Sequence, residues 1–132
     1  MKRLIAFVLA CAGMLNALAV AETFRDPALP LIVAGFSFGG YVASQVASRL
    51  PETAKAARVV LVGPATANFS VAPVPADTLV IHGEADDVVP LQATLDWARP
   101  QVLPVVVLPG VGHFFHGQLA LLKTLVVQAC RA

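Results

Sequence analysis

Short hydrophobic runs alternate along the chain with stretches in which hydrophobic residues recur every three or four positions. From residue 28 onward the short runs are rich in β-branched residues, and the first of them, residues 31–34, is too short and too continuously apolar for a half-exposed strand. The stretches that follow have helical spacing. This alternation predicts an α/β domain in which a parallel sheet of about four strands is flanked by helices.

Prolines help to place the ends of these elements. Val42, Val46 and Leu50 are four residues apart, which indicates a helix face, and Pro51 ends that helix. Pro104 interrupts the last strand, so we expect that strand at the edge of the sheet. We expect the last helix to be well buried. The predicted strands are 31–34, 58–62, 78–82 and 103–108, the predicted helices are 42–50, 91–98 and 118–130, and the proline-rich segment 63–75 is a connecting loop.

The N-terminus has the pattern of a secretory signal peptide. Lys2 and Arg3 precede an apolar stretch at 4–20, and residues 19–21 supply a small-x-small cleavage pattern. The alternatives are a retained membrane anchor and a hydrophobic N-terminal helix in the core. We therefore expect a signal peptide at 1–21 and export to the periplasm or the medium, with a cytoplasmic location as the alternative.

Composition excludes some classes of protein. Hydrophobic residues make up 58% of the chain and charged residues 13%, which excludes a disordered tail. The formal net charge is +1 and the basic residues are scattered singly, so a nucleic-acid partner is not expected. Cys11 would be removed with the signal peptide, so no disulfide framework is predicted, and we expect Cys130 to be a small buried residue of the last helix.

The sequence Gly35-Phe36-Ser37-Phe38-Gly39 has the form G-x-S-x-G and lies between a predicted strand and a predicted helix. In that context the turn is so tight that the serine takes strained dihedral angles, and a side chain at Gly35 or Gly39 would collide with a neighbouring element. Ser37 would stand clear of the sheet beside the N–H groups of a helix N-terminus. The pattern predicts a nucleophilic serine.

Acidic residues follow the third predicted strand. Asp86 and Asp87 lie where open α/β sheets place their sites, and one of them can accept a hydrogen bond from the N–H of a histidine while the other is solvated or caps the next helix. We expect Glu84 to be a loop charge and His82 to be a structural ring bonded to the backbone.

A histidine follows the fourth predicted strand. His113 has glycines before it and two phenylalanines after it that would shelter its ring, and it competes with His116, which is more typical of a helix start. An imidazole held between an acid and a serine makes the hydroxyl nucleophilic. A metal site is a weaker interpretation, because no helical His-x-x-x-His and no cysteine pair accompany these residues.

Three stretches together resemble the α/β-hydrolase superfamily. GFSFGG, IHGEADDVVP and GVGHFFHG are similar to the nucleophile, acid and histidine motifs of small bacterial hydrolases of the dienelactone-hydrolase-like group, over about residues 28–132. The resemblance implies that Ser37 is the nucleophile, that Asp86 rather than its neighbour is the acid, and that His113 is the general base.

The chain departs from that family ahead of the nucleophile. Members resemble one another in having about four strands and a helix before it, whereas about ten residues separate the predicted cleavage site from the strand here. We therefore expect residues 22–132 to form a partial domain, the C-terminal half of the fold. The Phe38 N–H is kept as an oxyanion donor, while the second donor normally comes from a loop after an earlier strand, and its loss would cost about 3 kcal/mol.

A partial sheet would also leave the strand at 31–34 as an uncovered apolar edge. A homodimer through that edge, or a retained N-terminal helix over the sheet face, would cover the exposed apolar surface. The third alternative is a fragment whose motifs survive without a complete site.

The function implied is that of a serine hydrolase of esterase or thioesterase type, which needs no cofactor and acts on a small acyl ester. The alternative is a non-catalytic truncated module that acts in binding or assembly. Phe69 and Val71, in the loop at 63–75, suggest an apolar acyl pocket, and the alternative is that they pack within the loop. Contact with a membrane is expected only if the N-terminal segment is retained.

Overall fold

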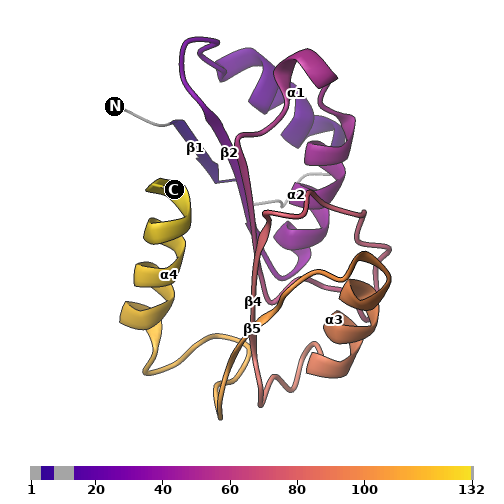
Figure 1. Cartoon of the computed structure of the whole chain (residues 1–132), viewed down its shortest axis with the longest axis vertical. Coiled ribbons are helices and arrows are strands. Elements are labelled where there is room, and N and C mark those ends of the chain that lie inside the picture. The colour runs from indigo at the N-terminus through magenta and orange to yellow at the C-terminus, as the bar shows by residue number, and fades with distance from the viewer. Residues whose placement is uncertain (1–3, 8–13, 132) are drawn as a thin grey trace.

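The computed structural model of the chain describes residues 4–7 and 14–131. A sheet stands in the middle, with α1, α2 and α3 on one side and α4 on the other (Figure 1). This arrangement confirms the predicted α/β class with flanking helices. The elements, in chain order, are β1 (Leu4–Phe7), α1 (Met14–Phe24), β2 (Leu31–Phe36), α2 (Phe38–Arg49), a 3-10 turn (Glu52–Ala54), β3 (Arg58–Val62), β4 (Leu79–Gly83), α3 (Leu91–Ala98), a 3-10 turn (Arg99–Gln101), β5 (Val106–Leu108) and α4 (Leu119–Arg131).

The strands of the described residues form one parallel sheet in the order β1-β2-β3-β4-β5. Phe36 at the end of β2 is opposite Val62 at the end of β3, and Gly83 at the end of β4 is opposite Leu108 at the end of β5. The carboxyl ends of these strands therefore meet at one rim of the sheet, which is where parallel sheets place their sites.

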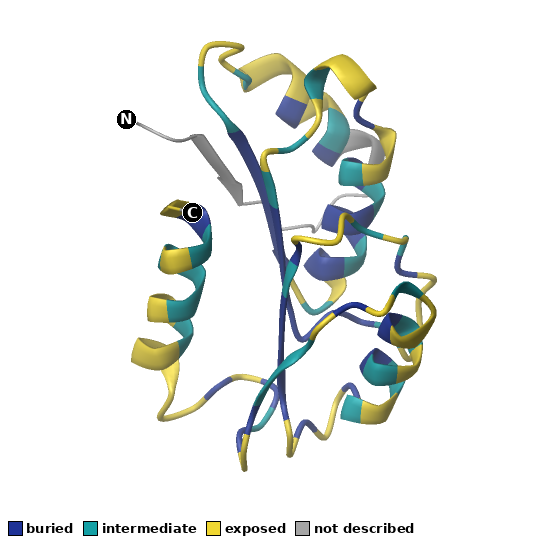
Figure 2. Cartoon of the chain, viewed as in Figure 1, coloured by how far each residue is buried: buried dark blue, intermediate teal, exposed yellow. Residues whose placement is uncertain are grey.

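Side chains alternate between the two faces of the sheet, as the pleat of a strand requires. Leu31 and Val33 of β2 belong to the hydrophobic core on the side of α1, α2 and α3, whereas Ala34 belongs to the core beneath α4. The middle strands β2, β3 and β4 are mostly buried, whereas many exposed residues lie on the outer sides of the helices and in the loops (Figure 2). The continuous hydrophobic runs in the sequence reflect burial of the strands on both faces.

The N-terminal residues take part in this fold, which adds a fifth strand to the four predicted. β1 pairs with β2, so residues 31–34 do not form the edge that was expected; β1 lies outside them. Of the stretch at 4–20 for which a helix was one alternative, residues 4–7 form a strand and residues 14–20 belong to α1, where Ala17 and Ala21 are buried in the core beside α2. Among the described residues, no helix has the length and hydropathy needed to cross a membrane. Removal of residues 1–21 stays a prediction.

The last strand and the last helix differ from their predictions. β5 lies at the edge, as expected, but it begins at Val106, two residues after Pro104, because a proline cannot donate to the ladder. The expectation of a well-buried last helix is wrong. Of the helices that the structure describes, only α4 covers this face of the sheet, so its outer side faces water, and Leu119 and Leu121 are exposed. Cys130, near its end, is buried as predicted.

Candidate active site

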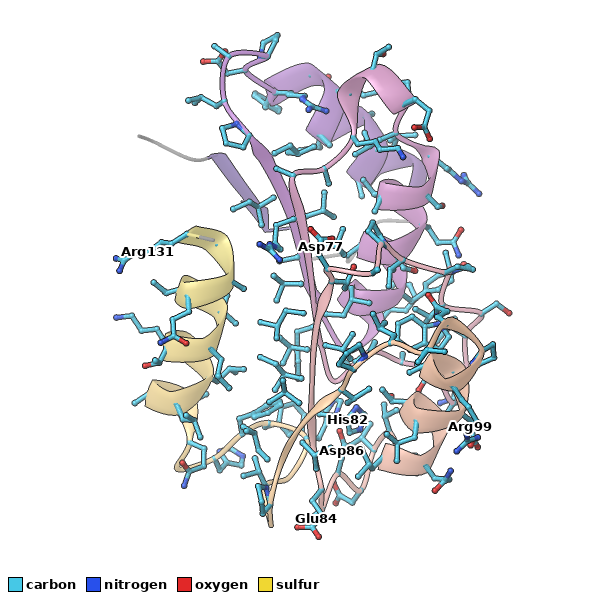
Figure 3. The ribbon with its side chains drawn as sticks, viewed as in Figure 1. Asp77, His82, Glu84, Asp86, Arg99 and Arg131 are labelled. Carbon is cyan, nitrogen blue, oxygen red and sulfur yellow. The ribbon has the colours of Figure 1, made fainter. Side chains whose placement is uncertain are left out.

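Three polar side chains meet at the rim where the parallel strands end. Ser37 follows β2, Asp86 follows β4 and His113 follows β5. His82, Glu84 and Asp86 lie together at the carboxyl end of β4 (Figure 3). The structure therefore brings together the serine, the acid and the histidine that the sequence singled out at the ends of separate strands.

The turn from β2 into α2 holds Ser37 in an unusual conformation. Its φ is 55° and its ψ is −119°, a backbone conformation that residues other than glycine rarely adopt. The backbone is held on both sides, because the Ser37 N–H donates to the Val62 carbonyl and the Ser37 carbonyl accepts from the Gly40 and Ala65 N–H groups. These bonds maintain the strain and lift the hydroxyl off the end of the sheet.

The tight turn also requires a glycine at position 35. A Cβ at this position would lie 1.9 Å from the Gly39 carbonyl oxygen, which is backbone and cannot move aside. We expect Gly35→Ala to lower the free energy of unfolding by about 3 kcal/mol or more, measured by urea denaturation. Gly112→Ala is the control, because a Cβ there meets nothing within 4 Å. Equal stabilities of the two variants would contradict this account of the turn.

The strain at Ser37 can be measured directly. Ser37→Gly and Ser37→Ala both remove the hydroxyl, but only glycine relieves a φ of 55°. We expect the glycine variant to be more stable than the alanine variant by about 1 kcal/mol, measured as the difference between their unfolding free energies. An alanine variant as stable as the glycine variant would show that the turn stores no strain.

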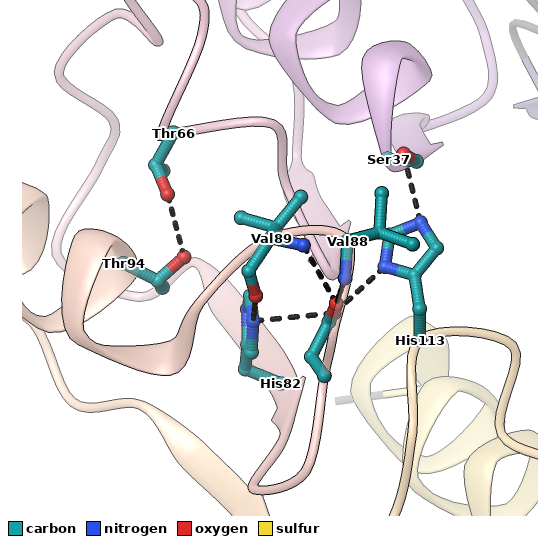
Figure 4. Close-up of polar contacts among 8 residues, drawn as sticks. Ser37, Thr66, His82, Val88, Val89, Thr94 and His113 are labelled. Carbon is teal, nitrogen blue, oxygen red and sulfur yellow. Dashed lines mark hydrogen bonds and ion pairs between the residues drawn. The ribbon is translucent and has the colours of Figure 1, made fainter.

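His113 joins the serine to the acid (Figure 4). Its Nδ1–H donates to Asp86 Oδ2 at 2.7 Å, since a carboxylate can only accept. The Ser37 hydroxyl donates to Nε2 at 3.0 Å. The His113 side chain is 2% exposed and that of Asp86 is fully buried, so bulk water competes little for these bonds. The ring is therefore held in the tautomer that can accept the serine proton.

The choice between the two aspartates is decided by the backbone around Asp86. Its Oδ1 accepts from the Val88 and Val89 N–H groups at 2.9 and 2.7 Å, which leaves Oδ2 for the histidine. Asp87 is exposed to solvent. Asp86 is thus fixed by four polar contacts, of which only the one to His113 was predicted from the sequence.

The fourth contact comes from His82, which was predicted to be a structural ring. It is fully buried, and its Nε2–H donates to the Val89 carbonyl at 2.8 Å. The same Nε2 lies 3.3 Å from Asp86 Oδ2 (Figure 4). His82 therefore bonds to the backbone as expected and also supports the carboxylate. The signal in the sequence was that His82 lies near the end of β4, four residues before Asp86.

Gly63 also borders the site and was assigned only to a connecting loop. It follows β3 with a φ of 49°, and a Cβ on it would lie 3.6 Å from His113 Nδ1 and 3.7 Å from Asp86 Oδ2. The sequence could have indicated this role, because Gly63 follows β3, the strand between those that lead to Ser37 and Asp86.

The remaining predicted groups lie outside the hydrogen-bonded set. His116 and Glu84 are exposed, although Glu84 Oε2 accepts from the Gly110 N–H and so joins the loops after β4 and β5. Phe114 packs edge-on against His113, with ring centroids 5.0 Å apart, whereas Phe115 is buried in the core beneath α4. Only the first of these two phenylalanines shelters the ring. No cluster of metal-ligating side chains occurs among the described residues.

The predicted oxyanion donor lies beside Ser37, whereas only one of the two residues predicted to line an acyl pocket is exposed. Phe38 is the first residue of α2, where a backbone N–H has no intrahelical acceptor, so its N–H is available beside Ser37. The expected second donor belongs to a loop after an earlier strand; the segment after β1, residues 8–13, lies outside the described residues. Val71 is buried in the core and is not free to line a pocket, while Phe69 is exposed.

Solved structures with the same architecture include α/β serine hydrolases. A lid-less α/β serine hydrolase from Xanthomonas campestris is 32% identical with a TM-score of 0.72, over 89% of this chain and 54% of that one. An α/β serine hydrolase homologue from Coxiella burnetii is 28% identical with a TM-score of 0.63, over 87% of this chain and 55% of that one. A protein of unknown function from Agrobacterium tumefaciens is 27% identical with a TM-score of 0.69, over 89% of this chain and 58% of that one.

The chain thus spans little more than half the length of these solved structures. No protein-family model matches it, and no curated protein matches it. The likeness is one of fold and of sequence, because the three identities lie between 27% and 32% over most of this chain.

Proposed function

We propose that this chain, which has the fold of the α/β serine hydrolases over about half of their length, is a serine hydrolase of esterase or thioesterase type acting on small acyl esters. The observation that carries the proposal is the continuous set of hydrogen bonds from the Ser37 hydroxyl through His113 to Asp86, at 3.0 and 2.7 Å. Packing alone does not require these three side chains to touch in this order. The arrangement is that of a nucleophile, a general base and an orienting acid.

Each residue has a role in the proposed reaction. The Ser37 oxygen attacks the carbonyl carbon of the ester while His113 Nε2 takes the hydroxyl proton, and Asp86 stabilises the imidazolium that forms. The bond to the alcohol oxygen then breaks, and His113 gives the proton to that oxygen. Water attacks the acyl-serine by the same route and releases the carboxylic acid.

The negative charge on the carbonyl oxygen needs donors that are already in place. The Phe38 N–H, at the first position of α2, is one such donor, and the positive end of the helix dipole adds to its effect. A single donor of this kind is worth about 3 kcal/mol of transition-state stabilisation. The proposed activity rests on this donor together with the base.

A fluorophosphonate probe tests the proposal on the intact chain. The activated serine displaces fluoride and becomes phosphonylated, so the mass of the folded protein rises by one phosphonyl group, which peptide mass spectrometry should locate on Ser37. Protein denatured before labelling is the control and should remain unlabelled. Folded protein with an unmodified Ser37 that fails to react would support the alternative, a non-catalytic module in binding or assembly.

A further inference from the structure

Aromatic side chains stand on both sides of Ser37. Phe38, Tyr41 and Phe69 contact one another with ring centroids 5.0 to 5.7 Å apart, and we call them the α2-side rings. Phe36 and Phe114 lie 6.0 Å apart, and each is 5.0 Å from the ring of His113; we call them the α4-side rings.

The two groups lie over opposite faces of the sheet. Tyr41 packs against the core beneath α2, and Phe69 contacts it from the loop after β3. Phe36 is two residues after Ala34 on β2, so it points to the same face as Ala34, the one covered by α4. Because Ser37 follows Phe36 and precedes Phe38, the nucleophile stands at the rim between the two groups.

These rings are exposed to water to an unusual degree. Phe36, Phe38, Phe69 and Phe114 are 36% to 58% exposed, and Phe24, at the end of α1, is exposed as well. Exposed rings gathered at one place mark a surface that an apolar ligand covers. Their position around a serine bonded to a histidine indicates that the ligand is the substrate of that serine.

We infer that the α4-side rings hold the alcohol part of the ester and the α2-side rings hold its acyl part; this inference rests on the proposed function. The substrate class is then an ester that is apolar on both sides of its carbonyl group. A small polar ester would leave both groups of rings in water.

The chemistry decides which group takes which part. His113 Nε2 must return its proton to the alcohol oxygen, so that oxygen and its substituent lie beside His113, where Phe36 and Phe114 are 5.0 Å from its ring. The carbonyl oxygen is directed to the Phe38 N–H. The remaining substituent on the tetrahedral carbon is the acyl chain, which extends away from His113, across Ser37 and onto the α2-side rings.

Both groups are held in place before any substrate binds. The loop that carries Phe69 is fixed by the Phe69 N–H bond to the Ala65 carbonyl at 3.1 Å, by the Thr66–Thr94 hydroxyl bond at 2.8 Å (Figure 4), and by Gln45 Nε2, which donates to the Ser70 carbonyl at 3.0 Å. On the other side, burial of Phe115 in the core anchors the loop that carries Phe114. Preorganised surfaces of this kind lose little entropy on binding.

Four esters test the assignment on the full chain: methyl acetate, benzyl acetate, methyl hexanoate and benzyl hexanoate. Methanol and benzyl alcohol are similar leaving groups, so a benzyl preference reports binding of the alcohol part. We expect Phe114→Ala to reduce the benzyl-to-methyl ratio of kcat/KM by about tenfold and to leave the hexanoate-to-acetate ratio unchanged. Phe69→Ala should do the reverse.

Phe24→Ala is the matched control, because it removes an exposed ring at the end of α1 and should change neither ratio. If Ser37 labels with the fluorophosphonate but Phe114→Ala and Phe69→Ala leave both ratios unchanged, or change both alike, the assignment of the rings is overturned and the proposed function stands. If Ser37 does not label and none of the four esters is hydrolysed, the proposed function fails and the inference fails with it.

Discussion

Ser37→Ala is expected to reduce ester hydrolysis by about 10⁵-fold to 10⁶-fold. Removing the hydroxyl takes away the attacking atom and the proton that His113 Nε2 accepts at 3.0 Å. The fold should persist, because the backbone bonds that hold residue 37 do not involve its side chain. The measurement is kcat/KM on benzyl hexanoate together with loss of fluorophosphonate labelling.

Ser48→Ala is the matched control for this substitution. Ser48 lies exposed on the same helix, and its hydroxyl donates to the Gln45 carbonyl within that helix. Its removal should leave kcat/KM within about twofold of the unchanged protein. Hydrolysis at the same rate in the Ser37 and Ser48 variants, purified alike, would show that Ser37 is not the nucleophile.

Asp86→Asn is expected to have the second largest effect, a loss of about 10³-fold to 10⁴-fold in kcat. The amide oxygen can still accept from the Val88 and Val89 N–H groups, so the loop should keep its shape. The amide nitrogen, however, would replace Oδ2 at 2.7 Å from His113 Nδ1. Two donors cannot bond, so the imidazole proton moves to Nε2 and the ring can no longer accept the serine proton.

Substitution of the neighbouring aspartate shows whether the loss of activity comes only from the change of net charge. Asp87→Asn removes the same charge from an exposed position and should leave kcat within about twofold of its original value. Circular dichroism of both variants checks that they are folded. A larger loss in the Asp87 variant than in the Asp86 variant would reverse the assignment of the acid.

The pattern of the sequence was sufficient for much of the fold. The predicted strand at 58–62 and the predicted helix at 91–98 match β3 and α3 residue for residue, because Val and Leu runs buried on both faces and prolines at helix ends are local signals. The strand at 4–7 was missed. Its apolar residues lie within the stretch that was predicted to be a signal peptide, and the pairing of β1 with β2 joins residues that are far apart in the sequence.

What the sequence determined by itself was the set of chemical groups and the strand ends that carry them: Ser37 in its glycine turn, two aspartates after one strand and two histidines after another. The tertiary structure alone decided which aspartate and which histidine meet the serine. Asp86 and His113 are bonded although they are 27 positions apart in the sequence, and His113 and Ser37 although they are 76 positions apart. It also placed the ring of Phe36 against Phe114 and the ring of Phe38 against Phe69. Local patterns specify backbone conformation, whereas contacts between distant residues depend on how the strands are ordered and how the faces are packed.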